Sequence, residues 1–268
     1  MKRIFIVLFS ACLLIASNFE VMFANNYTIN LPSDDYATIA QFTQKRTITA
    51  KYDIGKTLDS QTISNTEVVG YCHVYLGQYR ANQKYDGKYY DAVLIKCAME
   101  PRRFQSESGR YFYGFSEKLN LQLELLDYET YQGNSPTNAT TGSTSYSFGI
   151  SGGYKEAAVS GSVNLKSAYC AVTDKSSVSE NLFDITYDYK PSVLDFIASS
   201  ERNVMLFEQT WQYATCEWTT SHANHTKYIK VNVDFGVSQS KHAGYASPFA
   251  YIVDQPAGYN LRYSNSMK

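Results

Sequence analysis

Hydrophobic and polar residues alternate with a period of two along much of this chain, which is the pattern of a β-strand with one buried face. The clearest run is 119–125, where leucines at every second position are separated by Asn120, Gln122 and Glu124. The best helix candidate, 192–200, is short. Runs rich in β-branched and aromatic residues predict further strands at 46–54, 68–79, 89–99, 110–115, 183–189, 204–211 and 228–235. Strands that do not alternate with helices exclude a doubly wound nucleotide-binding fold and predict an all-β chain built as a β-sandwich.

A different pattern separates the two sets of predicted strands. Residues 132–144 are almost entirely Asn, Ser, Thr and Gly, a composition that cannot bury enough surface to order itself. Two strongly alternating arms follow, joined by a polar turn at Lys155 and Glu156. The apolar face of the arms consists of Tyr146, Phe148, Ile150, Tyr154, Val159, Val163 and Leu165. Each arm has about ten residues, the length that a tilted strand needs to cross the hydrocarbon layer of a bilayer.

Charged side chains are nearly absent around these arms. Between Glu129 and Asp174 the only ones are Lys155, Glu156 and Lys166. A membrane-spanning strand is apolar toward lipid and can be small or polar toward a water-filled lumen. A single hairpin would leave unpaired backbone amides in lipid, so insertion requires several copies that close into a barrel. The alternative is an ordinary sandwich hairpin with one face in the core and the other in water.

Aromatic residues make up 15% of the chain, with 24 Tyr, 14 Phe and 2 Trp, which excludes a disordered protein. Lys+Arg is 24 and Asp+Glu is 25, so the net charge is -1. Because phosphate binding needs a clustered positive excess, this balance argues against a nucleic-acid partner. Trp211, Tyr213 and Trp218 are candidates for contact with a membrane, since indole and phenol rings favour the bilayer interface. Core packing within a sandwich is the alternative for the same three residues.

The N-terminus has the pattern of a secretory signal peptide. Lys2 and Arg3 precede an apolar run over 4–16, and a cleavage position follows Ala24. The run falls short of the roughly 20 residues that span a bilayer as a helix, although an uncleaved anchor is the alternative. We therefore expect a secreted protein from which residues 1–24 are removed.

Removal of that segment discards Cys12 and leaves Cys72, Cys97, Cys170 and Cys216. Four cysteines in an exported chain predict two disulfides, for which three connectivities exist. Pairing of Cys72 with Cys97 is favoured because they lie in neighbouring strand-like runs, and this leaves Cys170 with Cys216. The spacings contain no CxxC pair, so no zinc site is predicted.

No catalytic or metal-binding arrangement stands out, and no cofactor is predicted. His222 and His225 lie three residues apart without a carboxylate or thiolate companion nearby in the sequence. His73 lies within a predicted strand and is interpreted as a structural histidine. Asp34 and Asp35 are interpreted as solvated charges in a loop. The chain is therefore not expected to be an enzyme.

The order of these features resembles the α-haemolysin/leukocidin family of small β-barrel pore-forming toxins. Residues 146–153 are similar to the entry of that family's stem, and residues 159–165 are similar to its returning arm. Similarity to the sandwich strands of the family is found at 90–95, 119–123, 183–187, 216–220 and 231–233.

The resemblance implies a β-sandwich with a folded-up amphipathic prestem hairpin. It divides the chain into the signal peptide (1–24), the N-terminal part of the sandwich (25–131), the prestem hairpin (132–175), and the C-terminal part of the sandwich with membrane-facing loops (176–268). It further implies a cytolysin that binds a lipid or receptor on a target-cell membrane, assembles into a homo-oligomer and inserts one hairpin per subunit. The alternative is a secreted adhesin or lectin-like binding module, which would remain monomeric on membranes.

Overall fold

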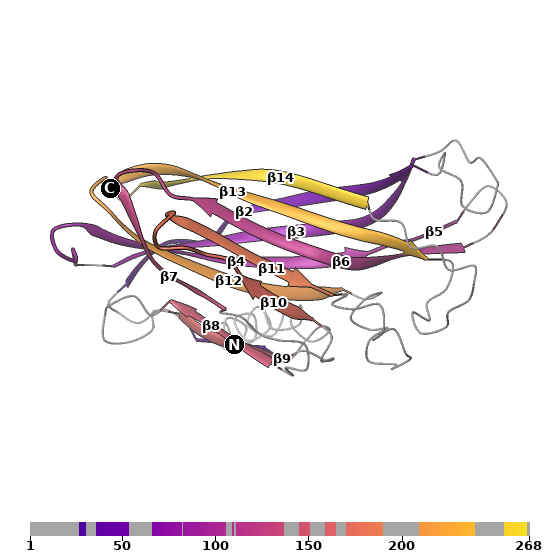
Figure 1. Ribbon diagram of the computed structural model, residues 1–268, viewed down its shortest axis with the longest axis horizontal. Helices are drawn as coiled ribbons and strands as arrows, with labels where there is room; N and C mark the ends of the chain where they lie inside the picture. The colour runs from indigo at the N-terminus through magenta and orange to yellow at the C-terminus, as the bar shows by residue number, and fades with distance from the viewer. Residues whose placement is uncertain are drawn as a thin grey trace, which may run out of the picture.

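The computed structural model describes residues 27–30, 36–53, 66–81, 83–105, 109, 111–136, 145–150, 159–164, 170–189, 209–238 and 255–266. Every regular element within these ranges is a β-strand, and the strands form two large antiparallel sheets and one small sheet (Figure 1). The predicted all-β sandwich is thereby confirmed. In the same ranges, no helix is long and apolar enough to cross a membrane. The predicted signal peptide and the predicted helix at 192–200 lie outside the described residues.

The first large sheet has the strand order β2-β3-β4-β12-β7. Its strands are β2 (Tyr36–Asp53), β3 (Thr66–Ala81), β4 (Tyr89–Pro101), β12 (Thr210–Thr220) and β7 (Glu129–Ser135). The tight turn between β3 and β4 is closed by mutual backbone hydrogen bonds between Tyr85 and Lys88. Its central residues, Asp86 and Gly87, both have positive φ, which is the geometry that a two-residue hairpin turn requires.

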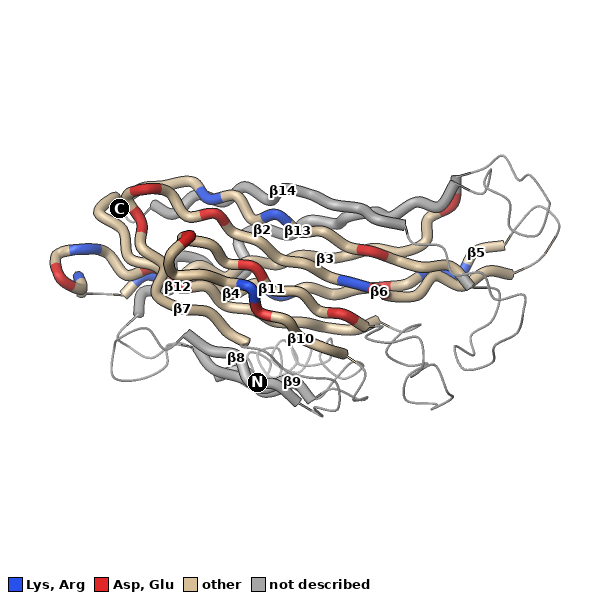
Figure 2. The backbone as a smooth tube through the Cα atoms, in the orientation of Figure 1, with Lys and Arg blue, Asp and Glu red and all other residues tan. Residues whose placement is uncertain are grey.

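The second large sheet has the order β10-β11-β6-β13-β14, and β5 pairs with the beginning of β6. These strands are β10 (Ala171–Asp174), β11 (Leu182–Asp188), β6 (Tyr111–Glu124), β13 (Asn224–Ser238), β14 (Gln255–Ser266) and β5 (Arg103–Gln105). Acidic and basic residues are interspersed along the described strands (Figure 2), in keeping with the near-zero net charge.

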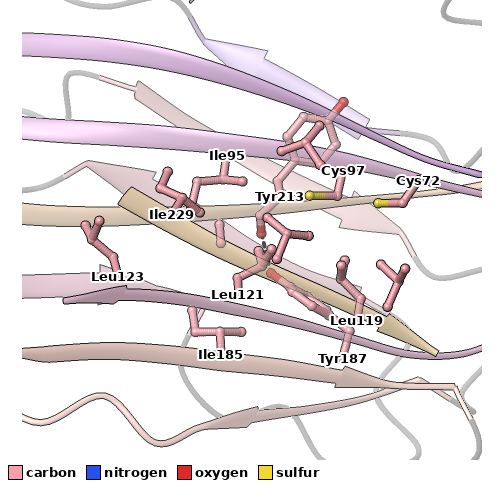
Figure 3. Close-up of a cluster of buried hydrophobic side chains, with 14 of the residues drawn as sticks. Cys72, Ile95, Cys97, Leu119, Leu121, Leu123, Ile185, Tyr187, Tyr213 and Ile229 are labelled. Carbon is pink, nitrogen blue, oxygen red and sulfur yellow. Dashed lines mark hydrogen bonds between the residues drawn. The ribbon is translucent and has the colours of Figure 1, made fainter. Parts of the chain in front are cut away.

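The core lies between the two large sheets and contains the leucines whose alternation predicted it. Leu119, Leu121 and Leu123 of β6 are each at most 1% exposed. The register sets them beside Tyr187, Ile185 and Phe183 of β11 on one side, and beside Val233, Val231 and Ile229 of β13 on the other. Side chains of β3, β4 and β12 from the facing sheet complete the cluster (Figure 3). Burial of these apolar groups is the main stabilising contribution to such a sandwich.

The cysteine predictions require a correction. Cys72, Cys97, Cys170 and Cys216 are all buried free thiols, so neither predicted disulfide is formed in the structure. Cys72 and Cys97 do lie side by side on β3 and β4, as expected for neighbouring strands (Figure 3). A buried thiol packs as a small apolar group, and this is the role that the four residues take in the core. Burial, together with the adjacent Cys72 thiol, raises the pKa of Cys97 well above its ordinary value.

Candidate functional site

The two alternating arms singled out in the sequence form a hairpin. Their described parts are β8 (Ser145–Ile150) and β9 (Val159–Asn164), which pair antiparallel. One set of opposed positions is Tyr146 with Val163, Phe148 with Gly161 and Ile150 with Val159. The alternate set is Ser145 with Asn164, Ser147 with Ser162 and Gly149 with Ser160. Because opposed residues in a β-ladder belong to the same face, the register separates a face of large apolar residues from a face of Ser, Gly and Asn. Tyr154 and Leu165 of the predicted set lie outside the described residues.

This hairpin belongs to neither large sheet. With β1 (Tyr27–Asn30) it makes a three-stranded sheet of order β1-β9-β8 beside the sandwich (Figure 1). β8 lies against β12 and β7 of the first large sheet. Since β12 is hydrogen-bonded to β4 and β7 on its two edges, β8 packs over a face of β12 rather than extending its sheet. The hairpin is therefore an addition to a sandwich whose two large sheets pair without it.

The outward face of β12 carries buried polar residues as well as the apolar Tyr213. Thr215, Glu217 and Thr219 occupy the positions that alternate with the core-facing Cys216 and Trp218, and all three are buried. The Tyr90 hydroxyl donates a hydrogen bond to Glu217 Oε2 at 2.8 Å. These polar groups can exchange their present partners for water, whereas Tyr213 and Leu94 of β4, which is opposed to Thr215, are buried apolar groups on the same face.

The three aromatic residues predicted for membrane contact take different positions. Tyr213 and Trp218 are both fully buried. Trp211 is half-buried, and the Lys96 ammonium lies 4.0 Å above its ring. The period-two pattern accounts for Trp218, since it shares the inward face with Cys216. Tyr213 lies on the opposite face and is nevertheless covered.

Of the six large hydrophobic side chains exposed among the described residues, Tyr111 lies at the start of β6 and Tyr228 lies on β13, and the other four lie on turns at one end of the sandwich. These four are Tyr85 in the β3–β4 turn, Leu126 and Tyr128 in the β6–β7 turn, and Val178 in the β10–β11 turn, with exposures of 37–67%. The strand register brings these turns to the same end. Next to the turns it pairs Arg80 with Asp91, Tyr89 with Thr220, Thr220 with Glu129, and Leu182 with Glu124. The imidazole of His222, in the β12–β13 turn, lies 3.9 Å from the Tyr128 ring, centroid to centroid. Sequence reasoning missed this set because each turn supplies only one or two apolar residues.

A buried cluster of charged residues lies between the sheets at the same end. Arg80 and Asp91 form an ion pair, Lys227 and Glu129 form a second one, and His225 lies between them with its Nε2 3.6 Å from Asp91 Oδ2. These groups also hold the turns, because Arg80 Nη1 donates to the Ala223 carbonyl at 2.7 Å and Glu129 Oε2 accepts from the Leu126 amide at 2.7 Å. The exposed turns are thus anchored to buried charges.

Burial governs the protonation of this charged cluster. It lowers the pKa of His225 to about 4, an effect that the nearby Arg80 cation reinforces. It raises the pKa of Asp91, although Arg80 and Lys227 oppose the shift. It also lowers the pKa of the Lys227 ammonium, which Asp91 opposes. No group of three or more His, Cys, Asp or Glu side chains suited to a metal ion occurs in the part of the chain that the structure describes.

Comparisons with known proteins give the following results. No family model and no curated protein sequence matches the chain. Among solved structures, Clostridium perfringens delta-toxin is similar at 10% identity and a TM-score of 0.47, covering 87% of this chain and 93% of that chain. A protein described as a pore-forming protein is similar at 8% identity and a TM-score of 0.45, covering 85% and 94%. The Clostridium perfringens NetB toxin in its membrane-inserted form is similar at 7% identity and a TM-score of 0.40, covering 82% and 94%.

Proposed function

We propose that this chain is a secreted pore-forming cytolysin that assembles on a target membrane and contributes its β8–β9 hairpin to a β-barrel. The observation that carries the proposal is the hairpin itself, an amphipathic β-ladder held outside a sandwich whose large sheets pair without it. A hairpin that served only as part of the core would belong to one of the large sheets.

The register of the hairpin supports a lipid-facing and a lumen-facing side. The positions of Tyr146, Phe148, Ile150, Val159 and Val163 fall on one face, and Ser, Gly and Asn positions fall on the other. A barrel strand needs this division, with apolar residues toward lipid and small polar residues toward water. Tyr154 and Leu165 extend the apolar set in the sequence, and we assign them to the same face.

Assembly of several copies follows from the backbone chemistry. In lipid, each unpaired N–H or C=O group costs several kcal/mol, so one hairpin cannot insert alone. A ring of copies pairs every strand with a neighbour and leaves no free edge. The partners of this protein are therefore a membrane lipid or surface receptor and further copies of the same chain, and its final location is the target-cell membrane.

Release of the hairpin would return the outward face of β12 to water. Thr215, Glu217 and Thr219 of β12 are polar groups that water can solvate once the hairpin leaves. Exposure of the apolar Tyr213 and Leu94 on the same face would cost about 25 cal/mol per Å², a cost that assembly of the barrel has to offset.

First contact with the membrane is assigned to the end of the sandwich that carries the exposed turns. Tyr85, Leu126, Tyr128 and Val178 present apolar and aromatic groups to solvent, and such groups favour the bilayer interface. Trp211, the half-exposed member of the aromatic residues considered from the sequence, is a secondary candidate. Tyr213 and Trp218 would need a rearrangement of the sandwich to reach lipid.

A pair of adjacent substitutions tests the proposal. Val163→Asp puts a carboxylate on the apolar face, whereas Ser162→Asp puts the same group on the polar face. Val163→Asp is expected to abolish release of dye trapped in liposomes, and Ser162→Asp is expected to preserve it, since a lumen-facing charge remains in water. Both variants should be secreted and soluble. Equal leakage from the two variants would contradict the hairpin assignment, and a wild type that stays monomeric on liposomes and releases no dye would favour a binding module instead.

A further inference from the structure

The buried charged cluster at the turn end is hydrogen-bonded to two of the exposed turns. Its five charged or titratable side chains are at most 7% exposed and come from Arg80 of β3, Asp91 of β4, Glu129 of β7, and His225 and Lys227 of β13. Arg80 donates to the Ala223 carbonyl in the β12–β13 turn, and Glu129 accepts from the Leu126 amide in the β6–β7 turn. Movement of these turns would therefore admit water to the cluster.

The charges of this cluster are already paired with one another. Both Asp91 carboxylate oxygens accept from Arg80, at 2.5 and 2.7 Å, and Glu129 is paired with Lys227. His225 Nε2 lies 3.6 Å from Asp91 Oδ2, which is beyond hydrogen-bond distance. A proton on His225 therefore adds a third cation to two buried ion pairs, and such a charge is unfavourable unless water reaches it.

We propose that this cluster is an acid-sensitive switch, in which proton uptake by His225 moves the turns away from the cluster and strengthens the contact of this end with a membrane. The inference rests on the proposed function, which assigns first contact to the exposed turns. Leu126, whose amide is bonded to Glu129, and Tyr128 belong to the same turn and are 41% and 37% exposed in the closed form. Loss of the bond to Glu129 would free this turn to place both side chains deeper in the bilayer interface.

Two polar atoms of the closed cluster lack hydrogen bonds, which lowers the cost of opening. Within the ranges that the structure describes, Trp218 Nε1 and Glu129 Oε1 are buried and have no hydrogen-bond partner. Trp218 belongs to the cluster, since its ring centroid lies 5.9 Å from that of His225 and 5.5 Å from Lys227 Nζ. Water that enters when the turns move can bond to both atoms, and this gain offsets part of the hydrogen bonding that the turns lose.

The protonation equilibria give the direction and size of the effect. Burial lowers the pKa of His225 to about 4, Arg80 adds to the lowering, and His222 of the adjacent turn is the other titratable group that acts on this ring. With its ordinary pKa of 6.5 in the open form, His225 binds more protons there, and it alone raises the population of that form by about 25-fold between pH 7.4 and 5.0. Lys227 acts in the same direction, because burial lowers its pKa to about 7, whereas the raised pKa of Asp91 acts against both.

Removal of the imidazole tests the switch. His225→Phe keeps an aromatic ring and His225→Gln keeps a neutral polar group, so a folding defect in one variant does not decide the result. His73→Phe is the matched control, because His73 is a strand histidine that pairs with Glu100 outside the cluster. Co-sedimentation with phosphatidylcholine liposomes, whose charge is the same at pH 7.4 and 5.0, measures binding. Hydrogen exchange of peptides covering 125–129 and 220–228 measures opening of the turns.

We expect the wild type and His73→Phe to bind about tenfold more tightly at pH 5.0 than at pH 7.4, and the two His225 variants to change by about threefold or less. At pH 5.0 both peptides should exchange faster in the wild type than in the His225 variants. No acid response in the wild type, an equal response in the His225 variants, or tighter binding without faster exchange would overturn the switch and leave the proposed function standing. A wild type that releases no dye from liposomes at either pH would overturn the proposed function, and the switch with it.

Discussion

Arg80 on β3 and Asp91 on β4 are opposed residues that form a bidentate ion pair buried from solvent. Arg80 Nε and Nη2 donate to Asp91 Oδ1 and Oδ2 at 2.5 and 2.7 Å, and both side chains are 0% exposed. The pair lies on the inner surface of its sheet, at the end where the turns carry exposed apolar residues. At this end the buried residues between the sheets are charged rather than apolar. They include Lys227 on β13 of the opposite sheet and Glu129 on β7 of the same sheet.

Removing one member of this pair is expected to be costly. Asp91→Ala leaves the Arg80 guanidinium buried without its counter-charge, so the free energy of unfolding should fall by about 3–5 kcal/mol. Guanidinium chloride titration followed by tryptophan fluorescence measures the change. The matched control is the double variant Arg80→Met with Asp91→Leu, which replaces the charges by apolar groups of similar size. We expect it to be near the wild type in stability, and a double variant as unstable as Asp91→Ala would contradict this account.

Acid is expected to weaken the same end of the protein through His225. Its pKa is about 4 in the folded state and 6.5 in the unfolded chain, so between these values the unfolded chain binds more protons. The free energy of unfolding should therefore fall by about 3 kcal/mol from this group as the pH drops from 6.5 to 4. The raised pKa of Asp91 acts in the opposite direction, because the folded state then binds the extra proton.

The variant His225→Phe isolates this contribution, because it keeps an aromatic ring beside Trp218 and cannot be protonated. Urea titrations at pH 7.0, 5.5 and 4.5 should show a smaller loss of stability in the variant than in the wild type. Identical pH profiles would mean that His225 does not carry the acid sensitivity of this cluster.

How much of this arrangement can be predicted from the sequence depends on how far apart along the chain the interacting residues lie. The period-two pattern at Leu119, Leu121 and Leu123 is local, and it predicts their buried face correctly. The alternation at 145–150 and 159–164 likewise predicts a hairpin, because the two arms are separated by only eight residues. Local patterns of this kind predict the structure correctly because successive side chains of a strand point to opposite faces and one face is buried.

Features that depend on contacts between residues far apart in the sequence cannot be predicted from local patterns. Arg80, Glu129 and Lys227 come from strands far apart in the chain, and only the pairing of two sheets brings their charges together. Tyr213 lies on the outward face of its strand, where alternation alone predicts exposure, yet it is fully buried. The free thiols show the same limit, since spacing places Cys72 beside Cys97 but does not decide whether a bond forms.

A close approach of backbones at Gly114 makes a further prediction. A Cβ at this position would collide with the Val69 carbonyl oxygen and lie 3.0 Å from the Arg102 carbonyl oxygen. The Gly114 amide also donates to the Arg102 carbonyl at 2.7 Å, so the strand cannot move aside without losing that bond. Gly114→Ala should lower the free energy of unfolding by about 1–3 kcal/mol. Gly133→Ala, where a Cβ would have no neighbour within 4 Å, is the control and should change stability by about 0.5 kcal/mol or less. Equal effects of the two substitutions would exclude the steric explanation.

The four cysteines are expected to be unreactive as long as the protein is folded. Burial raises the pKa of the Cys170 and Cys216 thiols, as it does for Cys97, and a thiol that is neither exposed nor ionised reacts slowly. Titration of the mature protein with a thiol reagent should give no rapid reaction in native buffer and four equivalents in denaturant. Two equivalents or none in denaturant would instead indicate disulfides, which purification under reducing and non-reducing conditions would distinguish from irreversible oxidation.

The exposed turns make the last prediction, which concerns membrane contact. Leu126 and Tyr128 are 41% and 37% exposed in the β6–β7 turn, and Leu126→Ser combined with Tyr128→Ser removes their apolar surface from the proposed contact end. Because burial of one such side chain contributes about 1.5–3 kcal/mol, the double variant should bind liposomes at least tenfold more weakly in a co-sedimentation assay. Tyr111 is a matched control, since it is 46% exposed but lies at the start of β6, away from the β6–β7 turn at that strand's other end. Tyr111→Ser should bind like the wild type. If it weakened binding as much as the turn variant, the contact would not be confined to the end that carries Leu126 and Tyr128.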